Sequence, residues 1–392
     1  MISFDQAQAL LVAAAKPLAR ERVPLTRAAG RVLADPVLAR FDAPAADVSM
    51  MDGYAVRQAD LPGTLTIVGE SFPGAGCGRE VRAGEAVRIF TGGPVPPGAD
   101  RVIMQEAAQR ERDVVRIEAS GDTPRFVRTA GSDFRTGEVL LAAGTRLRPR
   151  ALVAAAAADC GQVEVWRRPR VAVLGTGDEL AEPGSARSRP GSVPDSITIA
   201  LAAYVGELGG EVVTRRLAPD DPARIGAEVA EALAAADVLV VAGGASVGEK
   251  DYARSVLADA GLEPIFTKVA MKPGKPVWFG RVGERLVLGL PGNPSSAMIT
   301  ARLFLAPLLA GLGGAEPAEA LRWREAALAE PLPECGDRET FVRGRWSGGC
   351  VAAFGNQDSG AQHVLAQAEL LIRRPAGAPA LGAGALVPVL DL

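Results

Sequence analysis

The chain has little of what several catalytic chemistries require. Its 392 residues include one histidine, His363, and four cysteines that are far apart and form no C-x-x-C pair: Cys77, Cys160, Cys335 and Cys350. Neither a zinc site nor a disulfide framework is indicated. A single histidine excludes His-rich metal clusters and allows a Ser-His-Asp triad only if His363 serves. Catalysis is therefore expected to depend on carboxylates, lysines and a metal ion.

The chain also lacks a strong charge and an obvious membrane segment. Its net charge is −3 and its basic residues are scattered, so binding to nucleic acid or to an anionic membrane is not expected. The first residues, Met1 to Asp5, do not resemble a signal peptide, and no uncharged segment has the length of a membrane span. We expect a cytoplasmic protein that binds neither nucleic acid nor membrane.

The length predicts two to four domains, each with its own core. Ser3 and Gln6 form a capping-box pattern before a helix that continues to Ala15, and Thr26 is expected to cap a second helix through Leu33. Composition shifts predict four domains. A discontinuous helical and extended domain covers 1–42 and 138–168, and a β-rich second domain covers 43–137. An α/β domain covers 169–314, and a small C-terminal β-barrel covers 315–392.

The α/β domain is predicted from the alternation of apolar strands with helical stretches. Expected strands lie at 171–174, 211–217, 238–241, 264–269, 277–279 and 285–290, and expected helices at 198–208, 222–236, 252–260 and 294–309. This order indicates a doubly wound, largely parallel sheet. Short runs at 65–68, 86–90, 101–104 and 114–117, separated by Gly and Pro, predict the β-rich domain.

Ligands of such a sheet bind beyond the carboxyl ends of its strands, so the loops there carry the chemistry. After the first strand, Gly175 to Glu179 offers backbone amides to an anion and carboxylates to a hard cation, although an ordinary Gly turn with a helix-capping Asp is the favoured interpretation of this motif alone. After the third strand, Gly243 to Tyr252 combines a glycine run with Ser246 and Asp251, which indicates a phosphate cradle with a metal ligand. A long loop in which Asp251 only caps the next helix is the alternative.

Two further loops favour anions. Lys272 and Lys275 lie three residues apart on a turn with two prolines, an arrangement that suits a bound oxyanion, although a solvated hairpin is the simpler reading of the motif alone. The segment Leu290 to Ser296 leaves a strand and enters a long helix, so it presents free amides at a positive helix end. Met51 to Tyr54 and Thr91 to Pro97 stand out in the β-rich domain, where common turn formers explain them without any function.

Taken together, these segments resemble the molybdopterin molybdenumtransferases, the family of bacterial MoeA and the gephyrin E domain. Each motif is short, but seven occur in register over nearly the whole chain, which makes the resemblance specific. They are Met51 to Val56, Thr91 to Pro96, Thr176 to Leu180, Asp220 to Pro222, Gly243 to Tyr252, Lys272 to Pro276 and Leu290 to Pro294.

The resemblance implies an elongated four-domain subunit with a MoaB/MogA-like α/β domain. It further implies a homodimer in which the α/β domain of one subunit and the β-rich domain of the other share the active site. The implied reaction converts adenylylated molybdopterin and molybdate into molybdenum cofactor and AMP, with Mg²⁺ required. Transient contacts with the molybdopterin adenylyltransferase and with downstream cofactor-maturation enzymes are also implied.

The resemblance assigns roles to individual residues. The residues that match molybdate ligands are Lys272, Lys275, Arg343 and Ser359. The acids that match magnesium-holding, water-orienting positions are Asp251, Glu179 and Asp221. Asp52 and Thr91 match positions that face the pterin from the partner subunit, and Lys268 matches a catalytic residue of the cleft. Further substrate-binding positions are Gly243, Gly244, Ser246, Pro291, Gly292, Asn293, Pro294, Arg128 and Asp133. We hypothesise that Mg²⁺ bridges the pyrophosphate while Lys268 and Lys272 screen its charge during displacement of AMP.

The sequence departs from the family pattern at two places. Ile197 follows Asp195-Ser196 where the family usually has Asn, which removes an amide from a loop near the nucleotide. The segment Gly360 to His363 differs from the usual His close behind the Ser. Two other functions remain open: a nucleotide enzyme like the molybdopterin adenylyltransferases, which share the α/β domain, and a scaffold like gephyrin. The sequence does not distinguish molybdate from tungstate.

Overall fold

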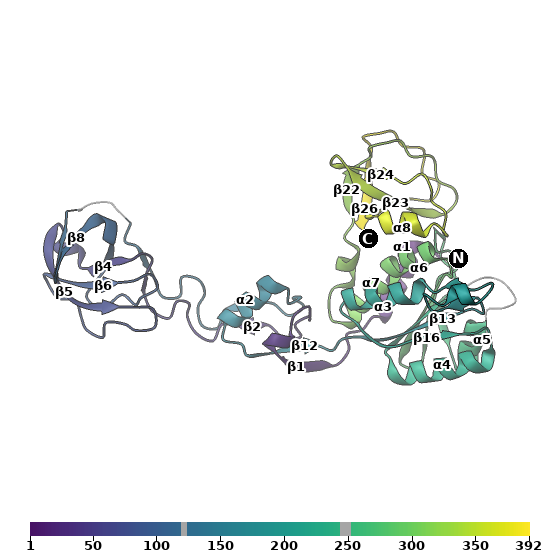
Figure 1. Cartoon of the computed structure of the whole chain (residues 1–392), viewed down its shortest axis with the longest axis horizontal. Coiled ribbons are helices and arrows are strands. Elements are labelled where there is room, and N and C mark those ends of the chain that lie inside the picture. The colour runs from purple at the N-terminus through teal and green to yellow at the C-terminus, as the bar shows by residue number, and fades with distance from the viewer. Residues whose placement is uncertain (119–123, 244–251) are drawn as a thin grey trace.

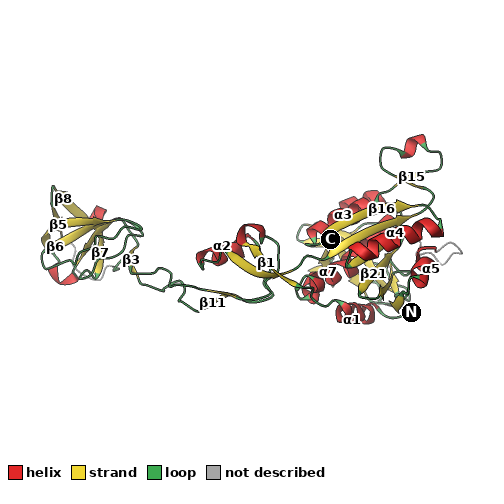
Figure 2. Cartoon of the chain, turned by 90° about the horizontal axis from the view of Figure 1, so that it is seen from below, coloured by secondary structure: helices red, strands yellow, loops and turns green. Residues whose placement is uncertain are grey.

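The computed structural model describes residues 1–118, 124–243 and 252–392, and it has a markedly elongated shape. A β-rich body lies at one end, a small arm lies in the middle, and a large body at the other end contains both chain termini (Figure 1). The same order of bodies is seen in the perpendicular view (Figure 2). The fold is multidomain, with one α/β region and separate β-rich regions.

The large body is built on a six-stranded sheet of order β16-β13-β17-β21-β20-β18. The strands β16, β13, β17 and β21 are parallel, β20 runs antiparallel to them, and β18, antiparallel to β20, again runs in their direction. Gly283, with φ of 55°, lies in the tight turn that joins β20 to β21, and so short a connection permits only antiparallel pairing. The strands are β13 (Arg170–Thr176), β16 (Glu211–Ala218), β17 (Val238–Ala242), β18 (Glu263–Phe266), β20 (Trp278–Val282) and β21 (Arg285–Leu290).

Helices cover both faces of this sheet, which confirms the doubly wound prediction. Alternate residues of β13 and β17 enter two separate cores, because side chains of a strand point alternately to opposite faces. One face packs against α1 (Phe4–Ala14), α3 (Ile197–Glu207), α6 (Pro294–Thr300), the π-helical turn Ala301–Leu305 and α7 (Ala306–Leu312). The other packs against α4 (Pro222–Ala235) and α5 (Tyr252–Asp259). Among the described residues, the stretch Pro294–Leu312 is long and apolar enough to cross a membrane, but 89% of the tested window is buried as core.

The N-terminal helix α1 begins as predicted, because Ser3 and Gln6 form the reciprocal bonds of a capping box. Its packing differs from the prediction that groups it with residues 20–42. Phe4 contacts Phe304 of the large body and Phe341 of the C-terminal region edge to face. These apolar contacts place α1 in the core of the large body.

The arm consists of two segments that are far apart in the sequence. Here β1 (Arg20–Pro24) pairs with β12 (Gln162–Trp166), β2 (Val37–Leu38) pairs with β11 (Val139–Leu141), and α2 (Pro149–Ala157) covers them. The helix predicted from Thr26 to Leu33 is wrong. Only the 3₁₀ turn Leu25–Arg27 forms, since Gly30 has φ of 76° and Leu33 bridges to Val165 instead. A bidentate ion pair from Arg167 to Asp237, 2.9 Å for each bond, ties the arm to the large body.

The β-rich body contains a six-stranded sheet of order β7-β4-β6-β5-β9-β8. The four short apolar runs predicted for this region each fall largely within a strand. The strands are β4 (Gly53–Val56), β5 (Gly63–Ser71), β6 (Glu85–Ile89), β7 (Arg101–Met104), β8 (Ala108–Glu111) and β9 (Val114–Ile117). A separate pair, β3 (Val48–Ser49) with β10 (Val127–Arg128), lies where this body meets the arm.

The C-terminal region forms a third sheet that rests on the large body. One of its edge strands, β19 (Met271–Lys272), comes from the large body and runs parallel to β23. The two regions are therefore joined by main-chain hydrogen bonds. The other strands are β22 (Arg324–Ala327), β23 (Glu339–Ser347), β24 (Cys350–Ala353), β25 (Leu370–Arg374) and β26 (Leu386–Asp391), and α8 (Gln362–Gln367) lies between β24 and β25.

Candidate functional site

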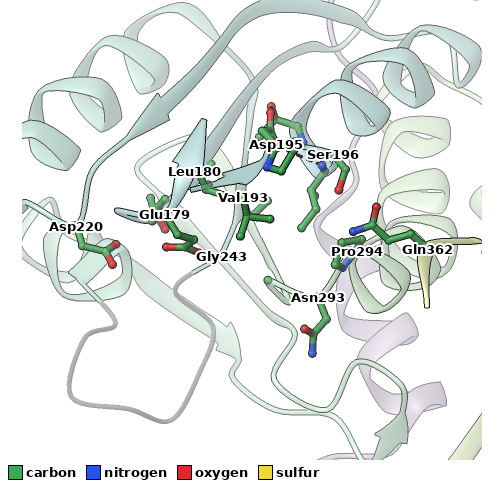
Figure 3. Close-up of a pocket in the computed structure, with 18 residues that line it drawn as sticks. Glu179, Leu180, Val193, Asp195, Ser196, Asp220, Gly243, Asn293, Pro294 and Gln362 are labelled. Atoms are coloured by element: carbon green, nitrogen blue, oxygen red, sulfur yellow. Dashed lines mark hydrogen bonds between the residues drawn. The ribbon is translucent and has the colours of Figure 1, made fainter. Parts of the chain in front are cut away.

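A cavity of about 560 Å³ lies at the carboxyl ends of the parallel strands, where a doubly wound sheet binds ligands. It is lined by the loop after β13, the segment before α3, the end of β17 and the N-terminus of α6, together with Asp220 and Gln362 (Figure 3). The lining residues are Gly175–Gly177, Glu179, Leu180, Val193–Thr198, Asp220, Ala242, Gly243, Gly292–Pro294 and Gln362. Two of the four predicted anion loops, Gly175 to Glu179 and Leu290 to Ser296, thus meet at this cavity. Gly243, the first residue of the third predicted loop, also lines it.

Glycine is required at the ends of two of these strands. Gly243 has φ of 98°, and a Cβ atom there would lie 2.6 Å from the Thr176 carbonyl oxygen. At Gly177 a Cβ atom would lie 2.7 Å from the Glu179 carboxylate. A side chain at either position would therefore clash or displace the lining. The small residues keep the main chain accessible at this edge of the sheet.

The α6 N-terminus lies on the other side of the cavity. Pro294 occupies its first turn and Asn293 its N-cap, and the Asn293 side chain does not cap the helix. Instead its amide nitrogen donates to Ser359 Oγ at 3.1 Å, so Ser359 from the C-terminal region reaches the α6 N-terminus. The helix end is suited to an anion because it is the positive end of the helix dipole; Pro294 has no N–H, and the Ser295 amide donates to the Ser359 carbonyl at 3.2 Å. Pro291 is buried just before it, and Gly292 is exposed.

The predicted magnesium ligands have different positions. Glu179 lines the cavity, and Asp251 lies outside the described residues, as do Gly244 and Ser246. Asp221 is the N-cap of α4, where its carboxylate accepts a bond of 2.8 Å from the Arg224 amide. Its neighbour Asp220 lines the cavity with Glu179 instead. Within the described residues no cluster of three or more His, Cys, Asp or Glu side chains has the arrangement of a metal site.

Sequence reasoning missed Asp220, although a signal was present. Pro222 is the first residue of α4, and a proline there commonly follows a capping residue, which identifies Asp221 as the cap. The preceding residue then lies outside the helix, and the Asp220 amide donates to Asp178 Oδ1 at 3.0 Å. In Figure 3, Asp220 and Glu179 lie toward one end of the cavity, and Asn293, Pro294 and Gln362 lie toward the other.

Asp195 and Ile197 form the wall near α3. Asp195 is buried and accepts bonds from the Ile197 amide at 3.1 Å, the Thr198 amide at 3.0 Å and the Arg215 guanidinium at 3.1 Å. The buried carboxylate is thus paired and caps α3. The Ile197 side chain lines the cavity beside Leu180 and Val193, which makes this wall apolar.

Gln362, at the start of α8, also lines the cavity and contributes a side-chain amide. The sequence analysis did not identify this residue.

The paired lysines lie outside this cavity lining. Lys272 and Lys275 are exposed and Lys268 is half-buried, on the loop that joins the large body to the C-terminal sheet. Gly274 between them has φ of 102°, and a Cβ atom there would lie 2.3 Å from Thr300 Cγ2 of α6. The loop is therefore pressed against the same helix whose N-terminus lines the cavity.

Arg343, predicted as a molybdate ligand, is buried and bonded throughout to protein. Its guanidinium donates to Ser295 Oγ at 2.7 Å, to the Asp358 carbonyl at 2.8 Å and more weakly to the Ala361 carbonyl. Burial lowers the pKa of Arg343, although the nearby Asp358 opposes that shift. These bonds fasten the segment 356–361, which carries Ser359, to α6. In the structure Arg343 positions the segment that carries Ser359, together with the bonds from Asn293 and the Ser295 amide to Ser359 itself.

Asp52 and Thr91 lie together at the far end of the molecule. Asp52 Oδ1 accepts bonds of 2.8 Å from both the amide and the hydroxyl of Thr91, and these bonds lower the pKa of Asp52. Asp52 directly precedes β4, and Thr91 lies shortly after the end of β6. Both strands are separated from the cavity by the whole arm (Figure 1). Arg128 and Asp133 lie between, on the exposed connection from the β-rich body to the arm. One chain therefore does not bring the predicted site residues into one place.

Comparison with known proteins defines the class. Residues 2–159 match the MoeA N-terminal region (domain I and II), residues 172–311 match a probable molybdopterin binding domain, and residues 325–392 match the MoeA C-terminal region (domain IV). These three regions, in this order, define a protein of MoeA architecture. The relatives and solved structures identify the family.

A molybdopterin molybdenumtransferase from a Nostoc species is 36% identical over 95% of this chain and 88% of its own. One from Synechococcus elongatus is 34% identical over the whole of both chains. The crystal structure of the molybdopterin biosynthesis MoeA protein of Pyrococcus horikoshii superposes with a TM-score of 0.85 at 27% identity, over the whole of both chains. The chain belongs to the molybdopterin molybdenumtransferase family, a family of transferases, as the sequence motifs predict.

Proposed function

We propose that the protein inserts molybdate into adenylylated molybdopterin in a Mg²⁺-dependent reaction that releases AMP and yields molybdenum cofactor. The observation that carries the proposal is the cavity at the strand ends, where two carboxylates face a helix N-terminus. A phosphoanhydride needs both elements, because its oxygens accept hydrogen bonds from free amides and a bridging cation needs acidic ligands. The full-length relatives named as molybdenumtransferases support the same reaction.

The donor set at the cavity fits a magnesium ion. Glu179 and Asp220 provide carboxylate oxygens, the ligands that Mg²⁺ prefers, and the ion typically keeps several waters beside one or two carboxylates. When bound there, Mg²⁺ would neutralise charge on the phosphoanhydride. The chain itself would attract the nucleotide phosphates through the positive end of α6 and orient the reacting groups between α6 and the loop after β13.

The oxyanion is proposed to bind near Lys272 and Lys275, beside Ser359. Ammonium groups and a hydroxyl suit a tetrahedral dianion. Ser359 is bonded to Asn293, so the oxyanion site and the cavity share the α6 N-terminus. Lys268 would screen the phosphates from the same loop. The tetrahedral shape and charge do not discriminate molybdate from tungstate.

We further propose that the active protein is a homodimer with shared sites. Asp52 and Thr91 lie at the opposite end of the chain from the cavity, so residues of both groups meet only if two chains lie side by side in opposite directions. Such a pairing is a symmetric arrangement that closes on itself. The reaction is proposed for the cytoplasm, with transient contacts to the adenylyltransferase and cofactor-maturation enzymes that precede and follow it.

The proposal is tested by incubating the purified full-length protein with adenylylated molybdopterin, Mg²⁺ and either molybdate or tungstate while AMP is measured. Release of AMP that depends on both an oxyanion and Mg²⁺ is the expected result. Omission of the oxyanion and addition of a chelator are the matched controls. If no AMP appears with either oxyanion, the proposed reaction is wrong.

A further inference from the structure

Four flat side chains form a continuous stack in the β-rich body. The Arg88 guanidinium carbon lies over two rings, 5.1 Å from the Tyr54 ring centroid and 4.9 Å from the Phe90 centroid. Phe90 in turn stacks on Phe72, with centroids 4.5 Å apart and ring planes 10° apart. We name the set Tyr54, Arg88, Phe90 and Phe72 the aromatic stack.

The stack is held rigidly. Arg88 donates to the Gly53 carbonyl at 3.0 Å and to Gln105 Oε1 at 2.5 Å, and these two bonds fix the plane of its guanidinium. Phe72 begins a tight turn in which it exchanges two main-chain bonds with Ala75, 2.9 and 3.0 Å long. Little conformational entropy therefore remains to be lost when something binds to it.

The stack is buried at one end and open at the other. Tyr54 is 4% exposed, whereas Phe72 is 42% exposed. Thr91 directly follows Phe90 in the sequence and holds the Asp52 carboxylate by two bonds. The Phe90 amide donates to the Ser71 carbonyl at 3.1 Å, and a Cβ atom at Gly92 would lie 3.5 Å from Pro73 Cγ, so the segment that carries Phe72 lies beside the segment that carries Thr91.

We propose that Phe72, at the open end of the aromatic stack, binds the flat heteroaromatic ring of the substrate held by the cavity of the second chain. This inference rests on the proposed function, and it names a subsite that the proposed function does not contain. A planar ring can stack on Phe72 with offset geometry, as Phe90 does, and Arg88 over Phe90 reinforces the stack through cation–π attraction.

The neighbouring charge favours a ligand ring over an apolar protein surface. Asp52 uses Oδ1 for both bonds from Thr91, and no described residue donates to its other oxygen. An apolar partner that covered Phe72 and Asp52 together would take this second oxygen out of water without offering it a donor. The pyrimidine part of a pterin carries ring and exocyclic N–H groups along one edge, and these can donate to Asp52 Oδ2 while the ring stacks.

The test measures AMP release by the full-length dimer as the pterin substrate and molybdate are varied separately. Phe72→Leu removes the ring and keeps apolar volume, and we expect it to raise the KM for adenylylated molybdopterin roughly threefold to tenfold. The kcat and the KM for molybdate stay unchanged. Phe72→Trp restores a low KM and makes the introduced indole fluorescence quench when the substrate binds.

Phe41→Leu is the matched control, because Phe41 is also 42% exposed and lies outside the stack. It should leave both KM values unchanged. An unchanged pterin KM in Phe72→Leu refutes the subsite alone, provided the unsubstituted protein turns over. Dissociation of the dimer by Phe72→Leu in sedimentation would show a subunit contact instead and would also overturn the inference. Absence of turnover in the unsubstituted protein refutes the proposed function, and the subsite falls with it.

Discussion

At the residue scale, two adjacent acids have separate tasks. Asp221 bonds the Arg224 amide as the N-cap of α4, while Asp220 lines the cavity. We expect Asp220→Asn to slow AMP release roughly 100-fold, because neutralising a carboxylate weakens charge stabilisation by a bound cation. Asp221→Asn should retain both activity and melting temperature, since Asn is an equally good N-cap. The opposite ranking of the two variants would restore Asp221 as the metal ligand.

The acidity of Asp52 is set by Thr91. Both bonds from Thr91 stabilise the ionised carboxylate and lower its pKa in the folded chain. A lowered folded pKa means that this contribution to stability is present above the ordinary pKa of Asp and is lost as pH falls through the lowered value. Thr91→Val removes the hydroxyl and should raise the pKa of Asp52 toward its ordinary value, whereas Thr91→Ser should not. Carboxyl NMR titration measures the difference, and equal pKa values in the two variants would contradict it.

Residue types and spacing were sufficient to predict much of the cavity, because glycine loops, capping residues and strand ends have local signatures. Glu179, Gly243, Asn293 and Pro294 were found in this way and line it. Gln362 was missed because its position depends on how the C-terminal sheet rests on α6, a long-range contact. The burial of Arg343 was missed for the same reason, since a sequence shows an arginine but not its acceptors.

At the element scale, Arg343 joins β23 to α6 and to segment 356–361. We expect Arg343→Met to reduce the free energy of unfolding by roughly 2–4 kcal/mol, because several buried acceptors lose their donor. Hydrogen exchange should become faster in segment 356–361, and KM for molybdate should rise as Ser359 loses its position. Arg345→Met, two residues further along the same strand and exposed, is the control. Weaker molybdate binding with unchanged stability and exchange would indicate direct contact with the oxyanion instead.

The lysine loop and α6 are in contact at Gly274. Gly274→Ala introduces a Cβ atom 2.3 Å from Thr300 Cγ2 and strains a backbone with φ of 102°. We expect a loss of roughly 1–3 kcal/mol in stability and a higher KM for molybdate. Thr300→Ser removes Cγ2, so the double variant should recover the steric part of the loss but not the backbone part. A double-mutant cycle by denaturant unfolding measures this coupling, and additive losses would show that the contact has no effect.

The doubly wound sheet of the large body followed from its alternating pattern, but the direction of β20 did not. Its sequence reads as a buried apolar strand like the others, and the short β20–β21 turn decides its antiparallel direction. The helix predicted at Thr26 failed because Gly30 adopts a positive φ that only the arm's tertiary structure requires. Local patterns thus identified most strands, while connections and arm packing set their directions and ends.

At the scale of the whole molecule, the shape separates the two groups of residues that we propose to form one site. The cavity lies in the large body, Asp52 and Thr91 lie in the β-rich body, and the arm keeps them apart (Figures 1 and 2). The Arg167–Asp237 ion pair and the two-stranded connection of the arm define the direction in which it leaves the large body. The proposed site would therefore be completed by a second copy of the chain, and this would account for motifs that occur in distant domains.

Subunit mixing tests this arrangement. Asp52→Ala chains and Asp220→Asn chains should each be nearly inactive alone. After dissociation and random reassociation in equal amounts, half of the dimers are mixed, and each mixed dimer contains one site built from an intact cavity and an intact Asp52. About a quarter of the normal activity should therefore return. Sites formed within single chains would regain nothing on mixing, because every chain carries one defect, so the absence of recovery in dimers shown to have exchanged subunits would refute the shared site.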